Sequence, residues 1–428
     1  MNLFLSKSNI EVLKDFFKIN FYILIIVNFG NLAQIFYQFF GGKVLKPENF
    51  GLLGSVNSII GLVSLPLAIF FNFALKFFIE KKNKLNSNQF QKIFNLLNSY
   101  VFYFAIIFFL IIIAMKDFFY YLINVEDFNI VILISITIFF NFITLPFIAI
   151  NQIYKRYKFV SAIGSIHHYL RFLFFVFFYY FVTKSYLSGL LANAISFFII
   201  FIILYFSLRN IIEIELIIDL KKFYNFFFFS KVKKSLLSIK SSIISTFFLT
   251  VITSIDIVIF RKVFPDELSG YYNAISTLGK IPLFLSAITF AYFLTESTYN
   301  FVNKNKSRTI LITNLLINFL IFLFFIIIYY FYGSEVITFL FNKNYSSFSS
   351  ELFFLTIAMT FVGFIKIIIL HLFSQNDNGY ALISIVALII ILLLCFFSVS
   401  HYQFIFTMIY GYLLMLIYLS IYLMTKKN

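Results

Sequence analysis

The sequence has little of what soluble enzymes and disulfide-bonded proteins contain. Only 12% of its 428 residues are charged, well below the roughly 25% typical of a soluble domain. A single cysteine, Cys395, excludes an internal disulfide. Walker A, HExxH, CxxC and Gly-rich nucleotide-loop motifs are absent. The sequence also offers no convincing Ser/His/Asp arrangement for nucleophilic catalysis. We therefore expect a protein that is not an enzyme and that uses no cofactor and no metal site.

Long apolar runs fill most of the chain, which is 62% hydrophobic with a mean hydropathy of +0.97. Each run is near the roughly 20 residues that a helix needs to cross the hydrocarbon core. The pattern predicts an all-α polytopic membrane protein with twelve transmembrane helices. The predicted spans are 19–40, 50–75, 93–114, 129–153, 160–182, 186–207, 241–263, 270–296, 310–331, 348–371, 379–399 and 402–424.

The net charge of +16 is distributed unevenly between the two sides of these spans. Of the 33 Lys and Arg residues, 23 fall in loops on the side of both termini, seven in the opposite loops and three inside spans. Because cytoplasmic loops carry the Lys and Arg excess, we expect both termini to be cytoplasmic. Topology explains the basic charge, so no nucleic-acid partner is expected.

Two related stretches indicate that the chain is built from two similar halves. KVLKPENFG at 43–51 and KVFPDELSG at 262–270 follow the first span of each set of six, and each ends in glycine. Glycine there suits a tight entry into the next helix. An even number of spans per half predicts parallel repeats with the substrate path between them. The expected division is a lobe at 1–207, an amphipathic cytoplasmic linker at 208–240 and a lobe at 241–428.

Three prolines inside spans, Pro66, Pro146 and Pro282, are expected to kink their helices, because proline removes a backbone hydrogen bond.

Charged residues at membrane depth are the first candidates for a site, since each costs about 2.5–3.5 kcal/mol on insertion scales. Arg171 lies in the middle of the fifth span, and His167 and His168 precede it by one helical turn. Lys280 lies well inside the eighth span. We interpret Arg171 and Lys280 as cavity-lining cations.

The remaining charged groups leave alternatives open. Asp256, the acid deepest in a span, is either a cavity residue or a charge partner of Arg171 or Lys280. Lys366 either joins the cavity or extends its ammonium group to the cytoplasmic interface.

Amides add a polar wall to this predicted cavity. Asn28, Asn31, Gln34 and Gln38 recur at helical spacing along one face of the first span, and Asn141 lies in the fourth. Such side chains also serve as contacts between helices. With a cationic excess, the cavity favours an anionic ligand, and the fork of an arginine suits phosphate.

Several of these residues carry a family resemblance over essentially the whole chain. KVLKPENFG followed by LLGSVNSIIGLVSL resembles the first-loop signature of polysaccharide-type (Wzx-like, O-antigen) flippases of the multidrug/oligosaccharidyl-lipid/polysaccharide exporter superfamily. Asp256, with Gly270-Tyr271 and Ala274, is similar to the pattern at the start of that family's second half. Ile257 stands where many relatives have arginine, so the partner of Asp256 is not given by the resemblance.

The resemblance implies a V-shaped pair of six-helix lobes in the bacterial cytoplasmic (inner) membrane. It implies alternating access that moves an undecaprenyl-diphosphate-linked oligosaccharide, a precursor of O-antigen, lipopolysaccharide or capsule, between leaflets. H+ or Na+ coupling is implied, with Asp256, His167 and His168 as candidates. A polysaccharide polymerase and a chain-length regulator are the implied protein partners.

Two other functions remain open from the sequence. A multidrug or cation exporter of the same superfamily would favour acidic cavity walls, for which Asp256 alone speaks. A membrane polysaccharide polymerase would need a larger outward loop than the longest one here, 332–347.

Overall fold

The computed structural model describes residues 7–67, 70–71, 87–209, 240–286, 307–375 and 377–425. Within these ranges every regular element is a helix. The first half contains α1 (Lys7–Val44), α2 (Pro47–Val63), α4 (Ser87–Ala114), α5 (Lys116–Ile123), α6 (Phe128–Ile153), α7 (Tyr157–Phe181) and α8 (Tyr186–Arg209). The second half contains α11 (Lys240–Val263), α12 (Asp266–Gly279), α14 (Ser307–Leu340), η1 (Lys343–Phe348), α15 (Ser349–Ser374), α16 (Ala381–Phe396) and α17 (His401–Thr425).

The predicted fold class, an all-α membrane protein, is confirmed. Each predicted span overlaps one of these helices, and nine of the described helical segments are long and apolar enough to cross a membrane. The short helices α5 and η1 were not predicted. All but the ends of the expected linker, 208–240, lies outside the described residues.

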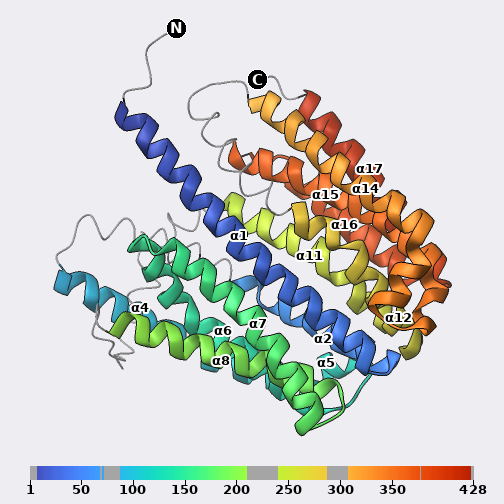
Figure 1. Cartoon of the computed structure of the whole chain (residues 1–428), viewed down its shortest axis with the longest axis horizontal. Coiled ribbons are helices and arrows are strands. Elements are labelled where there is room, and N and C mark those ends of the chain that lie inside the picture. The colour runs from blue at the N-terminus through green and yellow to red at the C-terminus, as the bar shows by residue number, and fades with distance from the viewer. Residues whose placement is uncertain are drawn as a thin grey trace.

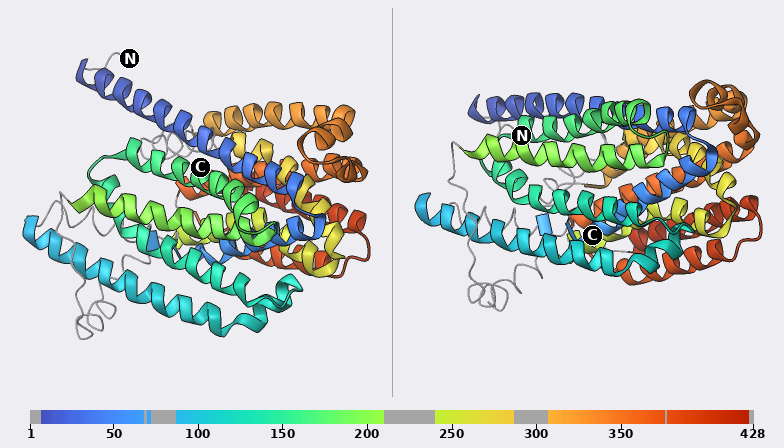
Figure 2. Two further views of the ribbon diagram at one scale, coloured as in Figure 1. Left: turned by 60° about the horizontal axis from the view of Figure 1, so that its bottom comes forward. Right: turned by 90° about the horizontal axis from the view of Figure 1, so that it is seen from below.

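The helices form two bundles that follow the two halves of the sequence (Figures 1 and 2). In the N-terminal bundle, α4 packs on α6, α6 on α8, α8 on α7, and α7 on α1. In the C-terminal bundle, α14 packs on α15, α15 on α17, α17 on α16, and α16 on α11. These contacts bury aliphatic and aromatic side chains, while the outer faces of the helices stay apolar and exposed, as expected for surfaces in contact with lipid.

The bundles meet through α2, which packs against α11 and α12 of the other half. α1 begins and α17 ends at the part of the molecule away from α12 (Figure 1). We call the contact region of α2, α5, α11 and α12 the closed end.

The glycines of the two related stretches explain how closely the bundles approach at the closed end. A Cβ atom on Gly51 would lie 2.7 Å from the backbone nitrogen of Gly270, and one on Gly270 would collide with the carbonyl of Pro47. A Cβ on Gly54 would meet the side chain of Asn273. The expected turn role was wrong, because both glycines lie inside helices and no described glycine has positive φ. Small residues are needed here because two helices cross at backbone distance.

Helices end near two of the three prolines at which kinks were predicted. α2 ends just before Pro66 and α12 just before Pro282, and each helix is capped by a residue outside it, Ser64 and Lys280. Pro146, in contrast, lies inside the continuous helix α6, so the kink expected there does not interrupt the helix.

Candidate functional site

Arg171 projects into the N-terminal bundle and away from the lipid-facing side of α7. Its side chain is 8% exposed, whereas Leu173 and Phe177 are 58% and 50% exposed. At 100° per residue, these two exposed side chains lie on the face of α7 opposite Arg171. Arg171 therefore faces the protein interior, and its role in lining a cavity stays a prediction.

The Arg171 guanidinium lies over an aromatic ring and has no counter-ion in the described part of the chain. Its central carbon is 3.9 Å from the centroid of the Tyr37 ring, and its buried Nε has no hydrogen-bond partner there. The Tyr37 hydroxyl donates to the Gly189 carbonyl (3.2 Å) and accepts from Asn57 Nδ2 (3.4 Å). A cation–π contact contributes about 0.5–2 kcal/mol and leaves the positive charge in place.

The two predicted histidines are next to Arg171. Their ring centroids are 5.3 Å apart, and the His167 ring packs 4.0 Å from the ring of Phe197 on α8. His167 Nε2 and His168 Nδ1 are buried without a hydrogen-bond partner among the described residues. The structure thus brings together the cluster of one arginine and two histidines that the sequence predicts.

Lys280, the second predicted cation, is neutralised. Its Nζ lies 2.8 Å and 2.9 Å from the two carboxylate oxygens of Asp256. Tyr272 and Ser276 each donate a hydroxyl hydrogen bond of 3.1 Å to Asp256 Oδ2. The alternative in which Asp256 is a charge partner of Lys280 is the observed one. Removing one partner of such a buried pair costs about 3–5 kcal/mol, because the remaining charge is left uncompensated.

The other predicted polar residues are partly buried. Phe29, Leu32 and Phe36, which are 45–56% exposed, cover a different face of α1 from the predicted amides. The partly buried set is Asn28, Asn31, Gln34 and Gln38 on α1, Asn141 on α6 and Lys366 on α15.

Arg261, a functional candidate that the sequence reasoning missed, joins the bundles at the closed end. It is 1% exposed and donates to the carbonyls of Ile123 (3.2 Å) and Glu48 (3.3 Å) in the N-terminal bundle. On its own side it binds Ser269 Oγ and the Asp266 carboxylate, both at 2.9 Å. We call this set the Arg261 clamp.

Further polar contacts reinforce the clamp. Asn124 Nδ2 donates to the Arg261 carbonyl (3.2 Å), and Asn273 Nδ2 donates to the carbonyl of Phe50 (3.0 Å). In the sequence, Arg261 looked like an ordinary loop cation, and the signal that points to it is the acid five residues later, Asp266.

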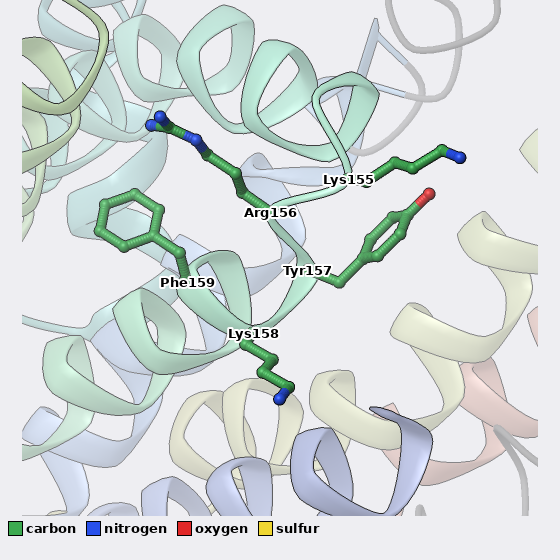
Figure 3. A pocket seen from close by; sticks show the side chains of 5 residues that line it. All are labelled: Lys155, Arg156, Tyr157, Lys158 and Phe159. Carbon is green, nitrogen blue, oxygen red and sulfur yellow. The ribbon is translucent and has the colours of Figure 1, made fainter. Parts of the chain in front are cut away.

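A cavity of about 430 Å³ lies where α6 ends and α7 begins (Figure 3). Figure 3 shows that the side chains lining this cavity diverge. Lys155 and Tyr157 lie on one side, and Arg156 and Phe159 lie on the other. Lys158 lies over the ring of Tyr22, 4.6 Å from its centroid. These basic side chains do not converge on one ligand position, and the cytoplasmic placement of this loop stays a prediction.

No family model matches the sequence, and a search of curated proteins finds no match. Solved structures do match. The lipid II flippase MurJ in an inward closed conformation has a TM-score of 0.71 at 12% identity, over 94% of this chain and 87% of that one. An inward-facing multidrug resistance MATE transporter of the MOP superfamily has a TM-score of 0.68 at 13% identity, over 95% of this chain and 100% of that one.

A third match is a MOP superfamily transporter from Pyrococcus furiosus whose reverse polarity of binding pocket suggests a different function. It has a TM-score of 0.61 at 12% identity, over 96% of both chains. At these identities the similarity concerns architecture. The chain is a multi-pass membrane protein with the fold of the lipid II flippase and MATE transporters.

Proposed function

We propose that the protein flips undecaprenyl-diphosphate-linked oligosaccharides across the bacterial cytoplasmic membrane, supplying O-antigen, capsule or a related polysaccharide. The fold shared with a lipid flippase and with multidrug exporters supports a transporter of this general kind. The observation that carries the choice of substrate is the buried Arg171, which has no carboxylate partner among the described residues. Its planar fork matches the oxygens of a phosphate or diphosphate.

A cation or drug exporter is the alternative function. In the sequence, Asp256 was the one acid that favoured an exporter. Its carboxylate accepts hydrogen bonds from Lys280, Tyr272 and Ser276. The cation-binding role of Asp256 is therefore satisfied within the chain, whereas the positive charge of Arg171 is not neutralised there. This asymmetry favours an anionic substrate.

We infer that transport proceeds by alternating access, with the closed end as the place where the bundles separate. In this mechanism the headgroup reaches Arg171 while the Arg261 clamp holds α2 and α5 against α11 and α12. The lipid tail stays in the bilayer between lobes 1–207 and 241–428, and the sugar is released outside after the clamp opens. Because Asp256 is ion-paired, His167 and His168 become the preferred candidates for H+ coupling.

The direct test is flipping of a fluorescent polyprenyl-diphosphate sugar in vesicles that contain the purified protein. Arg171→Gln removes charged hydrogen bonds worth about 1.5–3 kcal/mol and should slow flipping roughly 10- to 150-fold. Arg171→Lys should retain part of the rate. Arg209→Gln, at the exposed end of α8, is the matched control and should flip normally.

Normal flipping by Arg171→Gln would contradict the proposal. Transport of cationic drugs by the same vesicles, without flipping, would establish the exporter instead. In cells, unpolymerised single units accumulating outside would identify a polymerase, and intermediates retained inside a flippase.

A further inference from the structure

Five buried polar atoms on α2, α7 and α8 of the N-terminal half have no hydrogen-bond partner among the described residues. They are Arg171 Nε, His167 Nε2, His168 Nδ1, Asn57 Oδ1 and Asn193 Oδ1. Folded proteins leave few buried polar atoms unpaired, so a group of them indicates a missing polar partner. Both donors and acceptors are represented, which a simple anion would not satisfy.

Contacts among α1, α2, α7 and α8 connect the residues that carry these atoms. On α8, Gly189 accepts the Tyr37 hydroxyl and Phe197 packs on His167. Asn193 lies one turn from each of these two residues, on the same face of α8. Asn57 of α2 reaches the same point, because its amide nitrogen donates to the Tyr37 hydroxyl. We call Tyr37, Asn57, His167, Arg171 and Asn193 the N-bundle chamber.

Tyr37 holds Arg171 in a way that a carboxylate would not. Its ring attracts the guanidinium without neutralising it, while its hydroxyl is fixed by Gly189 and Asn57. The ring also packs 4.9 Å from Phe175, which fixes its plane. Lys280 shows the contrasting case in the same chain, since its ion pair with Asp256 has no net charge to attract an anionic ligand.

We propose that the N-bundle chamber binds the phosphate and the adjoining sugar of the headgroup, with Tyr37 as a positioning residue that takes the place of a counter-ion. Arg171 binds phosphate oxygens, and the amide oxygens of Asn57 and Asn193 accept hydrogen bonds from sugar hydroxyls. The inference rests on the proposed function and confines recognition to one lobe, excluding the Lys280 pair of the other.

The test uses the purified full-length protein, with glucose 1-phosphate as the probe in calorimetric titrations. The wild type should bind glucose 1-phosphate more tightly than glucose or inorganic phosphate. Asn193→Leu should weaken binding roughly 3- to 10-fold, the effect of one neutral hydrogen bond. Tyr180→Phe, on the exposed face of α7, should bind like the wild type.

Two substitutions of equal size separate the positioning role of Tyr37 from a merely structural one. Tyr37→Glu places a carboxylate beside Arg171 and should abolish binding, whereas neutral Tyr37→Gln should bind within roughly 10-fold of the wild type. Tyr37→Phe keeps the ring and should stay within roughly threefold, because the two neutral hydrogen bonds that are lost join Tyr37 to Gly189 and Asn57 and do not reach the ligand. Melting temperatures verify that each variant is folded.

Equal losses for Tyr37→Glu and Tyr37→Gln, or wild-type affinity in Asn193→Leu, would overturn the inference. Excess phosphatidylglycerol should not displace the probe, and displacement would assign the chamber to bulk lipid. If Arg171→Gln stops flipping while Tyr37→Glu and Asn193→Leu flip normally, this inference fails and the proposed function stands. Normal flipping by Arg171→Gln would contradict both this inference and the proposed function.

Discussion

Replacing Arg261 by methionine should release the closed end. The guanidinium donates two hydrogen bonds to the other bundle, at 3.2 Å to Ile123 and 3.3 Å to Glu48. A hydrogen bond from a charged group contributes about 1.5–3 kcal/mol, so the two together stabilise the closed end by about 3–6 kcal/mol. The lower bound alone corresponds to a roughly 100-fold shift of the equilibrium toward separated bundles.

Cysteine labelling measures this shift. Ser55 is fully buried on α2, and its hydroxyl lies 3.5 Å from the carbonyl of Ile257 in the other bundle. Ser55→Cys in a Cys395→Ala background therefore reports opening of the closed end to a membrane-impermeant maleimide. Arg261→Met should raise its labelling rate by roughly the factor by which the open population grows.

Ser135→Cys, buried within the N-terminal bundle on α6, is the control and should label equally slowly with or without Arg261. An unchanged rate at Ser55→Cys in the Arg261→Met protein would refute the reasoning, because the clamp would then contribute nothing to closure. A rise at both positions would indicate general unfolding instead.

Two further predictions concern helix contacts and the buried ion pair. Gly270→Ala drives a methyl group into the Pro47 carbonyl, and such overpacking costs about 1–3 kcal/mol, so it should raise labelling of the closed end. A methyl group at Gly61 would meet nothing within 4 Å, so Gly61→Ala should leave the labelling rate unchanged. Equal labelling rates in the two variants would contradict the explanation that the helices cross closely at Gly270. Asp256→Asn leaves Lys280 buried without its charge partner and should destabilise the protein by about 3–5 kcal/mol, seen as a lower melting temperature. Adding Lys280→Met should restore most of that loss, and additive losses would show that the pair is not coupled.

The helices were predictable because apolar runs of membrane-spanning length have few other structures available to them. The repeat was also visible, in the matching stretches at 43–51 and 262–270. The role of the glycines in these stretches could not be predicted. A glycine in a turn and a glycine at a close helix crossing look alike in sequence. Only the partner across the contact distinguishes them, as Pro47 does for Gly270.

The candidate site residues were predictable to the level of residue type. Arg171 and its two histidines were identified because charge at membrane depth is costly, and they do lie together. Which cation Asp256 neutralises depends on how α11 packs on α12, and sequence spacing does not encode that contact. Nothing in the sequence distinguishes Tyr37 from the other tyrosines, of which the chain has 28 in all. Arg261 resembled an ordinary cation of a loop.

The central claim is that an un-neutralised arginine inside the N-terminal bundle receives the phosphate of a lipid-linked sugar. A structure of the full chain in a nanodisc, bound to an undecaprenyl-diphosphate sugar, tests it most directly. The account predicts phosphate density within hydrogen-bond distance of the Arg171 guanidinium, with the Lys280–Asp256 pair intact. A headgroup bound at Lys280, with Arg171 still stacked on Tyr37 and empty of ligand, would contradict it.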